Sequence, residues 1–268
     1  MAISVPAPAV RASRSILGMR VDATTYEEAA DLIVSWAAAG ESRAVCVGTV
    51  HMVMEAHDDP SFREVVNGAD LVTSDGMPLV WGLRLLGVPG ATRVYGPDLT
   101  PVVCREAAAA GVPVGFHGGS PATLARLLER VRRDHPGLEI AYAESPPFGE
   151  LTPERLEREA EAVAASGARI LFVGLGCPKQ ERWMAAQRGR IPAVMLGVGA
   201  AFDFLAGTKR QAPRLLQRAG LEWAFRLATE PRRLWRRYLA NNPRFLALFG
   251  AQVLRERLER GGTSEVCT

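Results

Sequence analysis

Hydrophobic residues follow two alternating spacings along most of the chain. Short, nearly continuous apolar runs, typical of buried strands, are separated by longer segments in which apolar residues recur every three or four positions, as on helices. The predicted strands are Ile16–Val21, Ala44–Thr49, Ala69–Thr73, Val112–Phe116, Leu138–Ala143, Arg169–Val173 and Ala193–Val198. This alternation predicts an α/β fold with a mainly parallel, Rossmann-like sheet of about six strands and helices on both faces.

The alternating pattern ends near Gly207, and everything after Pro213 reads as helix. Prolines open or interrupt each helical segment, which predicts separate helices over 213–219, 221–229, 231–241 and 243–260. The chain therefore divides into a disordered tail (1–15), an α/β domain (16–208), a basic amphipathic helical appendage (209–260) and a flexible C-terminus (261–268).

Composition narrows the class of protein. The 268 residues are 48% hydrophobic, enough for a sizeable core, but no apolar run reaches the length of a membrane span and the first residues lack the apolar centre of a secretory signal. The four cysteines are scattered without a CxxC pair, and the histidines do not fall at metal-ligand spacings. We expect a cytoplasmic location, with no disulfide, bound metal or cofactor.

Charge is distributed unevenly although the net charge is only +3. Residues 209–260 hold 13 basic side chains against 4 acidic ones. A basic helical segment of this kind can contact nucleic acid or an anionic membrane surface, or it can simply be a solvated helix face. Charge by itself does not separate these alternatives.

An acidic turn lies at the centre of the stretch ADLVTSDGMPLVW. Asp75 follows the predicted strand Ala69–Thr73 and precedes an apolar helix that opens at Met77. Because ligands of open α/β sheets bind outside the carboxyl ends of the strands, a carboxylate at this point can face a substrate. The alternative is that Ser74 or Asp75 only caps the helix.

Two glycines occupy a comparable position later in the chain. Gly118 and Gly119 follow the strand Val112–Phe116, and Ser120 and Pro121 then open a helix. A strand, glycines and a helix N-terminus can together hold a phosphate. An ordinary tight turn between strand and helix has the same composition, so the motif is weak when taken alone.

A set of motifs in fixed order is more specific. Asp75 in TSDGMPLVW, Arg93 in RVYGPDL, the GLGCPKQE segment and the closing GLEWAFRLATEPRR resemble the WecG/TagA/CpsF family of bacterial inverting glycosyltransferases, over about Ile16 to Phe245. The resemblance implies transfer of a sugar, often N-acetylmannosamine or a relative, from a UDP donor. The acceptor would be a sugar on undecaprenyl diphosphate at the inner face of the cytoplasmic membrane, in cell-wall polymer or exopolysaccharide biosynthesis.

The resemblance also implies roles for particular residues. Asp75 matches the family's general base, and Arg93 matches an arginine suited to planar contact with phosphate. Gln180 matches the glutamine of the PKQE segment, which would hold donor sugar or phosphate. Thr49 stands where many members have an asparagine, 26 residues before the aspartate, so the contact made there should differ. No metal is needed if protein cations hold the leaving diphosphate.

The appendage gains a role by the same comparison. Its arginines would reach the active site, with Arg226, Arg233 and Arg236 as the candidates by motif position, while its apolar face would meet the membrane. Large apolar residues interleave with these arginines, as an interfacial helix requires. The alternative is a helix that docks on its own core and leaves the arginines in water.

Two other functions compete with this hypothesis. A nucleotide-dependent oxidoreductase could use a similar sheet, but no GxGxxG motif follows the first predicted strand. A nucleic-acid-binding protein could use the basic segment, but Asp75, Arg93 and Gln180 would then have no role. The sequence leaves open the transferred sugar and whether the protein forms a homo-oligomer.

Overall fold

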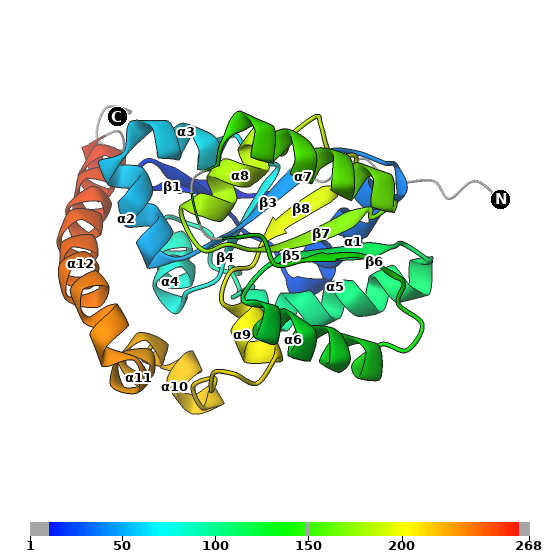
Figure 1. Cartoon of the computed structure of the whole chain (residues 1–268). Helices are drawn as coiled ribbons and strands as arrows, with labels where there is room; N and C mark the ends of the chain where they lie inside the picture. Colours follow the sequence, from blue (N-terminus) through cyan, green and yellow to red (C-terminus); the bar gives the residue numbers. More distant parts are fainter. Residues whose placement is uncertain (1–10, 148, 150, 263–268) are drawn as a thin grey trace.

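A parallel six-stranded sheet forms the centre of the protein, in the order β4-β3-β8-β7-β5-β6 (Figure 1). The computed structural model describes residues 11–147, 149 and 151–262. All neighbouring pairs in this sheet are parallel, so the predicted α/β architecture is confirmed. The strands are β3 (Arg43–Gly48), β4 (Leu71–Ser74), β5 (Val114–Gly118), β6 (Ile140–Glu144), β7 (Ile170–Gly174) and β8 (Val194–Gly197).

Helices cover both faces of this sheet and bury two separate apolar clusters. One cluster lies under α1 (Tyr26–Ala38), α5 (Gly96–Ala110), α6 (Pro121–Asp134) and α9 (Ala201–Leu205). The other lies under α2 (Val50–Asp58), α3 (Pro60–Asn67), α4 (Met77–Leu85), α7 (Pro153–Ser166) and α8 (Lys179–Gln187). Strands buried on both faces are nearly all apolar, which is why the sequence shows continuous runs instead of alternation.

The first predicted strand is wrong in its detail. Ile16–Val21 does not form one strand but belongs to an antiparallel hairpin of β1 (Ser13–Ile16) and β2 (Met19–Asp22). Leu17 and Gly18 form its turn with positive φ angles of 51° and 90°. The hairpin begins inside the range 1–15 predicted as a disordered tail; residues 1–10 of that range lie outside the described residues.

The appendage also differs from the prediction. After α10 (Arg214–Arg218) and α11 (Glu222–Thr229), one helix, α12 (Pro231–Gly262), continues through Pro243. Proline removes the hydrogen bond to the carbonyl of residue 239, whose side chain is 62% exposed, so water can take the place of that bond. The helix also includes Gly261 and Gly262 of the predicted flexible end; residues 263–268 lie outside the described residues.

Long-range contacts hold α12 against the α/β domain. Phe245 and Phe249 are buried in the cluster under α4, and Arg244 pairs with Asp58 of α2 at 2.6 Å. Gln252 accepts a hydrogen bond from the backbone of the β1–β2 turn at 2.9 Å. These contacts make α12 a wall along one side of the protein (Figure 1).

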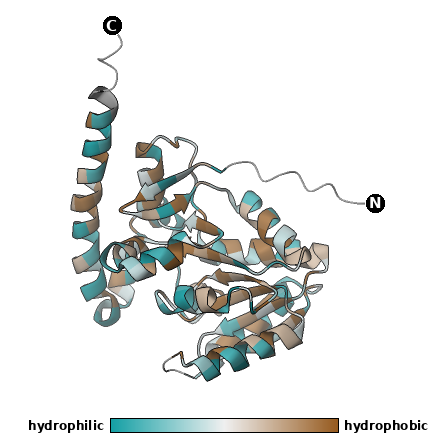
Figure 2. Cartoon of the chain, turned by 90° about the horizontal axis from the view of Figure 1, so that it is seen from above, coloured by the Kyte–Doolittle hydropathy of each residue, from teal (hydrophilic) through white to brown (hydrophobic). Residues whose placement is uncertain are grey.

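The opposite face of α12 is mixed in character. Figure 2 shows polar and apolar residues alternating along it, and its exposed large apolar side chains are Trp235, Leu239, Leu246, Leu254 and Leu258. Among the described residues, no helix has the length and apolarity needed to cross a membrane.

Candidate active site

The acidic turn lies at the carboxyl end of β4 and is fixed by backbone contacts. The Asp75 amide donates to the carbonyl of Gly48 at 2.9 Å, and the Asp75 carboxylate accepts from the Gly96 amide at 3.3 Å. Gly76 precedes α4 without any side-chain cap, so the alternative in which Ser74 or Asp75 caps this helix is wrong. The Asp75 carboxylate is directed toward the start of α5, and its Oδ1 lies 3.5 Å from Nη2 of Arg93.

The surroundings of Asp75 change its acidity. Burial raises the pKa of Asp75 to about 6; the positive charge of Arg93 opposes this shift, and the negative charge of Glu222 adds to it. A carboxylate with a pKa near 6 is ionised at neutral pH and is more basic than an exposed aspartate. This combination suits a group that takes a proton from a hydroxyl.

Arg93 connects this turn to the appendage. Its Nε donates to the backbone carbonyl of Asp75, its Nη2 donates to Glu222 of α11 at 2.6 Å, and its Nη1 donates to Gln217 of α10 at 3.1 Å. The guanidinium also lies over the ring of Tyr95 at 4.0 Å. Since these contacts use three of its five N–H donors, a phosphate could bind Arg93 through the remaining N–H groups or by replacing Glu222 or Gln217.

The three appendage arginines named from the sequence differ in their positions. Arg226 lies close enough to Asp75 to lower its pKa, stacks over Phe204 at 5.4 Å and has a buried Nε with no hydrogen-bond partner among the described residues. Arg233 is exposed and pairs with Glu230 at 2.7 Å. Arg236 is exposed and lies over Trp235 at 5.3 Å. The fold therefore brings only Arg226 of these three beside the acidic turn.

Thr49 and Gln180 have partners within the protein. The hydroxyl of Thr49 accepts from the Met52 amide at 3.2 Å and caps α2. Gln180 is 4% exposed; its Oε1 accepts from the Gly176 amide at 3.1 Å, and its Nε2 donates to Glu181 at 2.7 Å. Both side chains shape loops at the carboxyl edge of the sheet.

The two glycines after β5 allow a close approach between strands. A Cβ on Gly118 would lie 2.6 Å from the backbone of Gly174 on β7, and the φ of Gly118 is +125°. The Gly119 amide donates to the Gly174 carbonyl at 3.1 Å. Since three strands separate β5 from β4, these glycines are on the order of 19 Å from Asp75, at roughly 4.8 Å per strand. The fold does not bring them together with the acidic turn.

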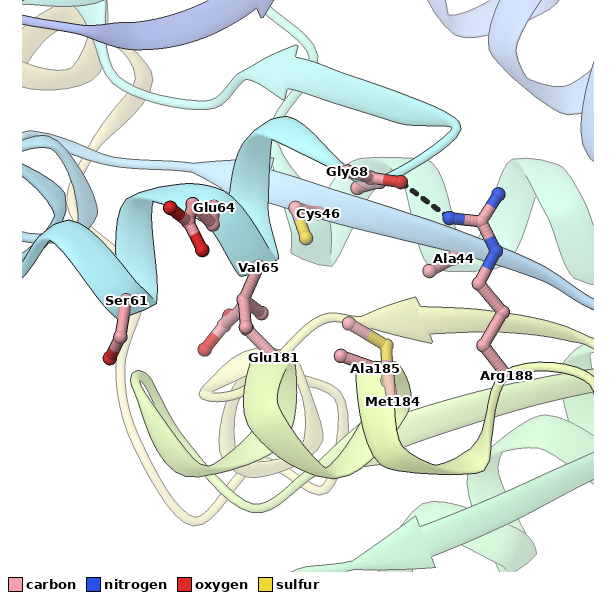
Figure 3. A pocket seen from close by; sticks show the side chains of 11 residues that line it. Ala44, Cys46, Ser61, Glu64, Val65, Gly68, Glu181, Met184, Ala185 and Arg188 are labelled. Atoms are coloured by element: carbon pink, nitrogen blue, oxygen red, sulfur yellow. Dashed lines mark hydrogen bonds between the residues drawn. The ribbon is translucent and has the colours of Figure 1, made fainter.

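A separate cavity of about 350 Å³ lies between α3 and α8 (Figure 3). Its lining residues are Ala44, Cys46, Ser61, Glu64, Val65, Gly68, Ala69, Glu181, Met184, Ala185 and Arg188. Gly68 and Ala69 precede β4, whereas Asp75 follows it, so the cavity lies away from the carboxyl edge. Burial raises the pKa of Glu181 to about 7.

Sequence reasoning missed two groups at the site. Glu222 stands inside the GLEWAF motif, and its pairing with Arg93 could not be read from either segment. Tyr95 stands inside RVYGPDL; it is 3% exposed, and its hydroxyl has no hydrogen-bond partner among the described residues. The available signal was that each residue is a polar side chain inside a motif already linked to the site. Throughout the described ranges, no three His, Cys, Asp or Glu side chains gather as they would around a metal ion.

The fold and this edge of the sheet define a class of protein: an α/β protein with a buried carboxylate and neighbouring arginines at the carboxyl ends of its strands, where ligands of open sheets bind. Comparison with known proteins makes this specific. Residues 14–260 match the glycosyl transferase WecG/TagA/CpsF family, and the chain belongs to this family. The protein is therefore a glycosyltransferase.

A curated relative supports the same assignment. The chain is 37% identical over 188 residues to the N-acetylglucosaminyldiphosphoundecaprenol N-acetyl-beta-D-mannosaminyltransferase of Bacillus spizizenii. The aligned part covers 69% of this chain and 70% of the relative.

Proposed function

We propose that this glycosyltransferase moves a hexose derivative from a UDP-sugar to a sugar carried on undecaprenyl diphosphate, with inversion at the anomeric carbon. The relative from Bacillus spizizenii, as its name states, transfers N-acetylmannosamine to an N-acetylglucosaminyl-diphospho-undecaprenol acceptor. The observation that carries the proposal is the buried carboxylate of Asp75, with its raised pKa, at the carboxyl edge of the sheet.

Asp75 acts as the general base in a single displacement. As the acceptor hydroxyl oxygen forms its bond to the anomeric carbon, its proton passes to the Asp75 carboxylate. The bond between the anomeric carbon and the donor phosphate breaks, and UDP leaves with the bonding electrons. One carboxylate is enough because the reaction forms no covalent sugar–enzyme intermediate.

The positive side chains near Asp75 stabilise the leaving group. Negative charge grows on the departing diphosphate, and Arg226 offers a guanidinium without a carboxylate partner beside the acidic turn. Arg93 donates to Glu222 and Gln217 and so joins the appendage to the acidic turn, and its remaining N–H groups can contact phosphate. Arg233 and Arg236 would need to turn inward to take part.

We further propose attachment to the inner face of the cytoplasmic membrane through α12. Its outward face combines exposed Trp and Leu side chains with arginines, which suits an anionic leaflet. A lipid-linked acceptor is confined to this surface, so attachment brings the enzyme and acceptor together.

A direct assay tests the proposed reaction. Purified protein is incubated with UDP-N-acetylmannosamine and N-acetylglucosamine linked through diphosphate to a short prenyl chain, and products are separated by mass. We expect a disaccharide product and UDP in equal amounts. A calorimetric panel of UDP, GDP, NAD and generic duplex DNA accompanies it. Binding of NAD or DNA but not UDP, with no disaccharide formed, would contradict the proposal.

A further inference from the structure

One arginine that the sequence motifs did not single out faces the same edge of the sheet. Arg237 is half-buried on α12, one helical turn before Asn241. The Asn241 amide lies 3.3 Å from Nδ1 of His51, in the first turn of α2. Its neighbour Arg236 points about 100° away around the helix and is exposed. The geometry of α12 therefore selects Arg237 for the inner face.

The surroundings of Arg237 hold positive charge and no carboxylate partner. Its electrostatic neighbours include Arg226, Arg233 and Cys177, and it acts in turn on His51. No hydrogen bond or ion pair joins Arg237 to another described residue. Burial, together with repulsion from the other arginines, lowers its pKa below the ordinary arginine value.

Three arginines of the appendage and its contacts are paired, and Arg210, Arg214, Arg218, Arg232 and Arg236, which have no ion pair among the described residues, are exposed to water. Arg93 has Glu222, Arg233 has Glu230, and Arg244 has Asp58. Arg226 resembles Arg237, because its Nε is buried without a hydrogen-bond partner in the described part of the chain and no ion pair joins it to a carboxylate. The two unpaired guanidinium groups are neighbours.

Burying a cation without a counter-charge destabilises a protein. The charges of Glu222 and Asp75 offset part of this cost at Arg226. No carboxylate in the described part of the chain acts on Arg237, so a ligand that supplies negative charge would stabilise the pair. A diphosphate meets this need, since guanidinium groups bind phosphate oxygens through two parallel hydrogen bonds. The N-terminal turn of α2, which contains His51, adds the positive end of a helix dipole to the same place.

We infer that Arg237 and Arg226 form the wall that binds the diphosphate of the sugar nucleotide, with Arg237 as a direct phosphate ligand. This inference rests on the proposed function, because it takes the donor to be a nucleoside diphosphate sugar. It assigns to Arg237 the inward position that motif spacing gave to Arg236.

Calorimetry on the full chain tests the assignment with UDP and with inorganic pyrophosphate as probes. Arg237→Met keeps the unbranched stem and removes the charge; Arg232→Met is the matched control, because Arg232 is an exposed arginine of the same helix. We expect Arg237→Met to weaken both probes on the order of 10- to 100-fold, the usual effect of losing a charged hydrogen bond. The control should bind as the wild type does.

Thermal melting separates ligand binding from a packing role. Without ligand, Arg237→Met should melt no lower than the wild type, because it removes an unpaired, half-buried charge. The rise in melting temperature that UDP gives the wild type should shrink strongly in the variant. If Arg237 binds phosphate directly, both results are expected together.

The remaining outcomes distinguish failure of the Arg237 assignment from failure of the proposed reaction with a UDP-sugar. Unchanged UDP and pyrophosphate affinity in Arg237→Met would overturn the assignment while leaving the proposed reaction intact. A further outcome is that the wild type binds pyrophosphate but not UDP, and that Arg237→Met loses pyrophosphate binding. This result would support the role of Arg237 in binding diphosphate and would contradict a uridine donor. A wild type that binds neither probe would overturn both.

Discussion

At the scale of single residues, the proposed mechanism depends on the carboxylate of Asp75, whose pKa is raised by burial. Asp75→Asn should reduce turnover about 10²- to 10⁴-fold, the usual contribution of a general base, and leave UDP affinity nearly unchanged. Single-turnover assays and calorimetry measure the two effects separately. Turnover at the wild-type rate would show that another group takes the proton.

The same substitution should stabilise the empty protein at pH 7.5. The folded-state pKa of Asp75, about 6, lies above the ordinary aspartate value, so ionisation of Asp75 destabilises the fold as the pH rises between these two values. Asparagine removes a cost on the order of 3 kcal/mol at that pH. Denaturant unfolding at pH 7.5 checks this gain, which should shrink toward pH 4.

Glu222 should tune the pH dependence of the reaction. The proposed mechanism requires ionised Asp75, so kcat/KM should fall as the pH drops through about 6. Because the charge of Glu222 helps to raise the pKa of Asp75, Glu222→Gln should move this acid limb to lower pH. Glu230→Gln is the matched control, since Glu230 pairs with Arg233 and Lys209 instead. If the wild type and both variants lose kcat/KM at the same acidic pH, the charge of Glu222 does not affect the pKa of Asp75.

At the scale of elements, α12 carries two different faces. Trp235, Leu239 and Leu246 are 46%, 62% and 68% exposed and lie within about 40° of one another around the helix. Replacing all three with serine should abolish sedimentation with phosphatidylglycerol vesicles, because arginines alone give a weak, salt-sensitive attraction.

The control for the triple serine variant is its turnover rate. With a short, water-soluble acceptor, membrane attachment is irrelevant, so the serine variant should turn over at nearly the wild-type rate. Undiminished vesicle binding by the variant would show that the outward face of α12 is not the membrane contact.

At the scale of the whole molecule, the appendage completes the site and also supports the core. A chain ending near Lys209 should keep the parallel sheet, whose strands all precede that point. It should melt well below the full chain, because Phe245 and Phe249 leave the apolar cluster under α4. Turnover should be lost even with a soluble acceptor, since Arg226 is removed and Arg93 loses Glu222.

Circular dichroism and the soluble-acceptor assay measure these effects. A truncated chain with full turnover would show that the α/β domain holds a complete active site. An unfolded truncated chain would show that the contacts of α12 with α2, α4 and the β1–β2 hairpin are required for the sheet to form.

The sequence by itself determined the local structure and the class of enzyme. Strand and helix periods are set by neighbouring residues, so the alternating pattern predicted the parallel sheet and placed Asp75 at the end of β4. The order of the motifs identified the family. Proline was less reliable: Pro243 predicted a break, but contacts on both sides of it keep α12 continuous.

Only the tertiary structure decided how the site is assembled. Arg93 and Glu222 are 129 positions apart, and no local pattern relates them. The choice of Arg237 over Arg236 depends on how α12 is rotated against α2, which packing of Phe245 and Phe249 fixes. The Gly118-Gly119 motif is locally identical whether its strand lies beside β4 or is separated from it by three strands. Strand order and helix rotation are set by contacts between residues far apart in the sequence. The hydrophobic pattern along the sequence shows which residues are buried but not which residues they pack against.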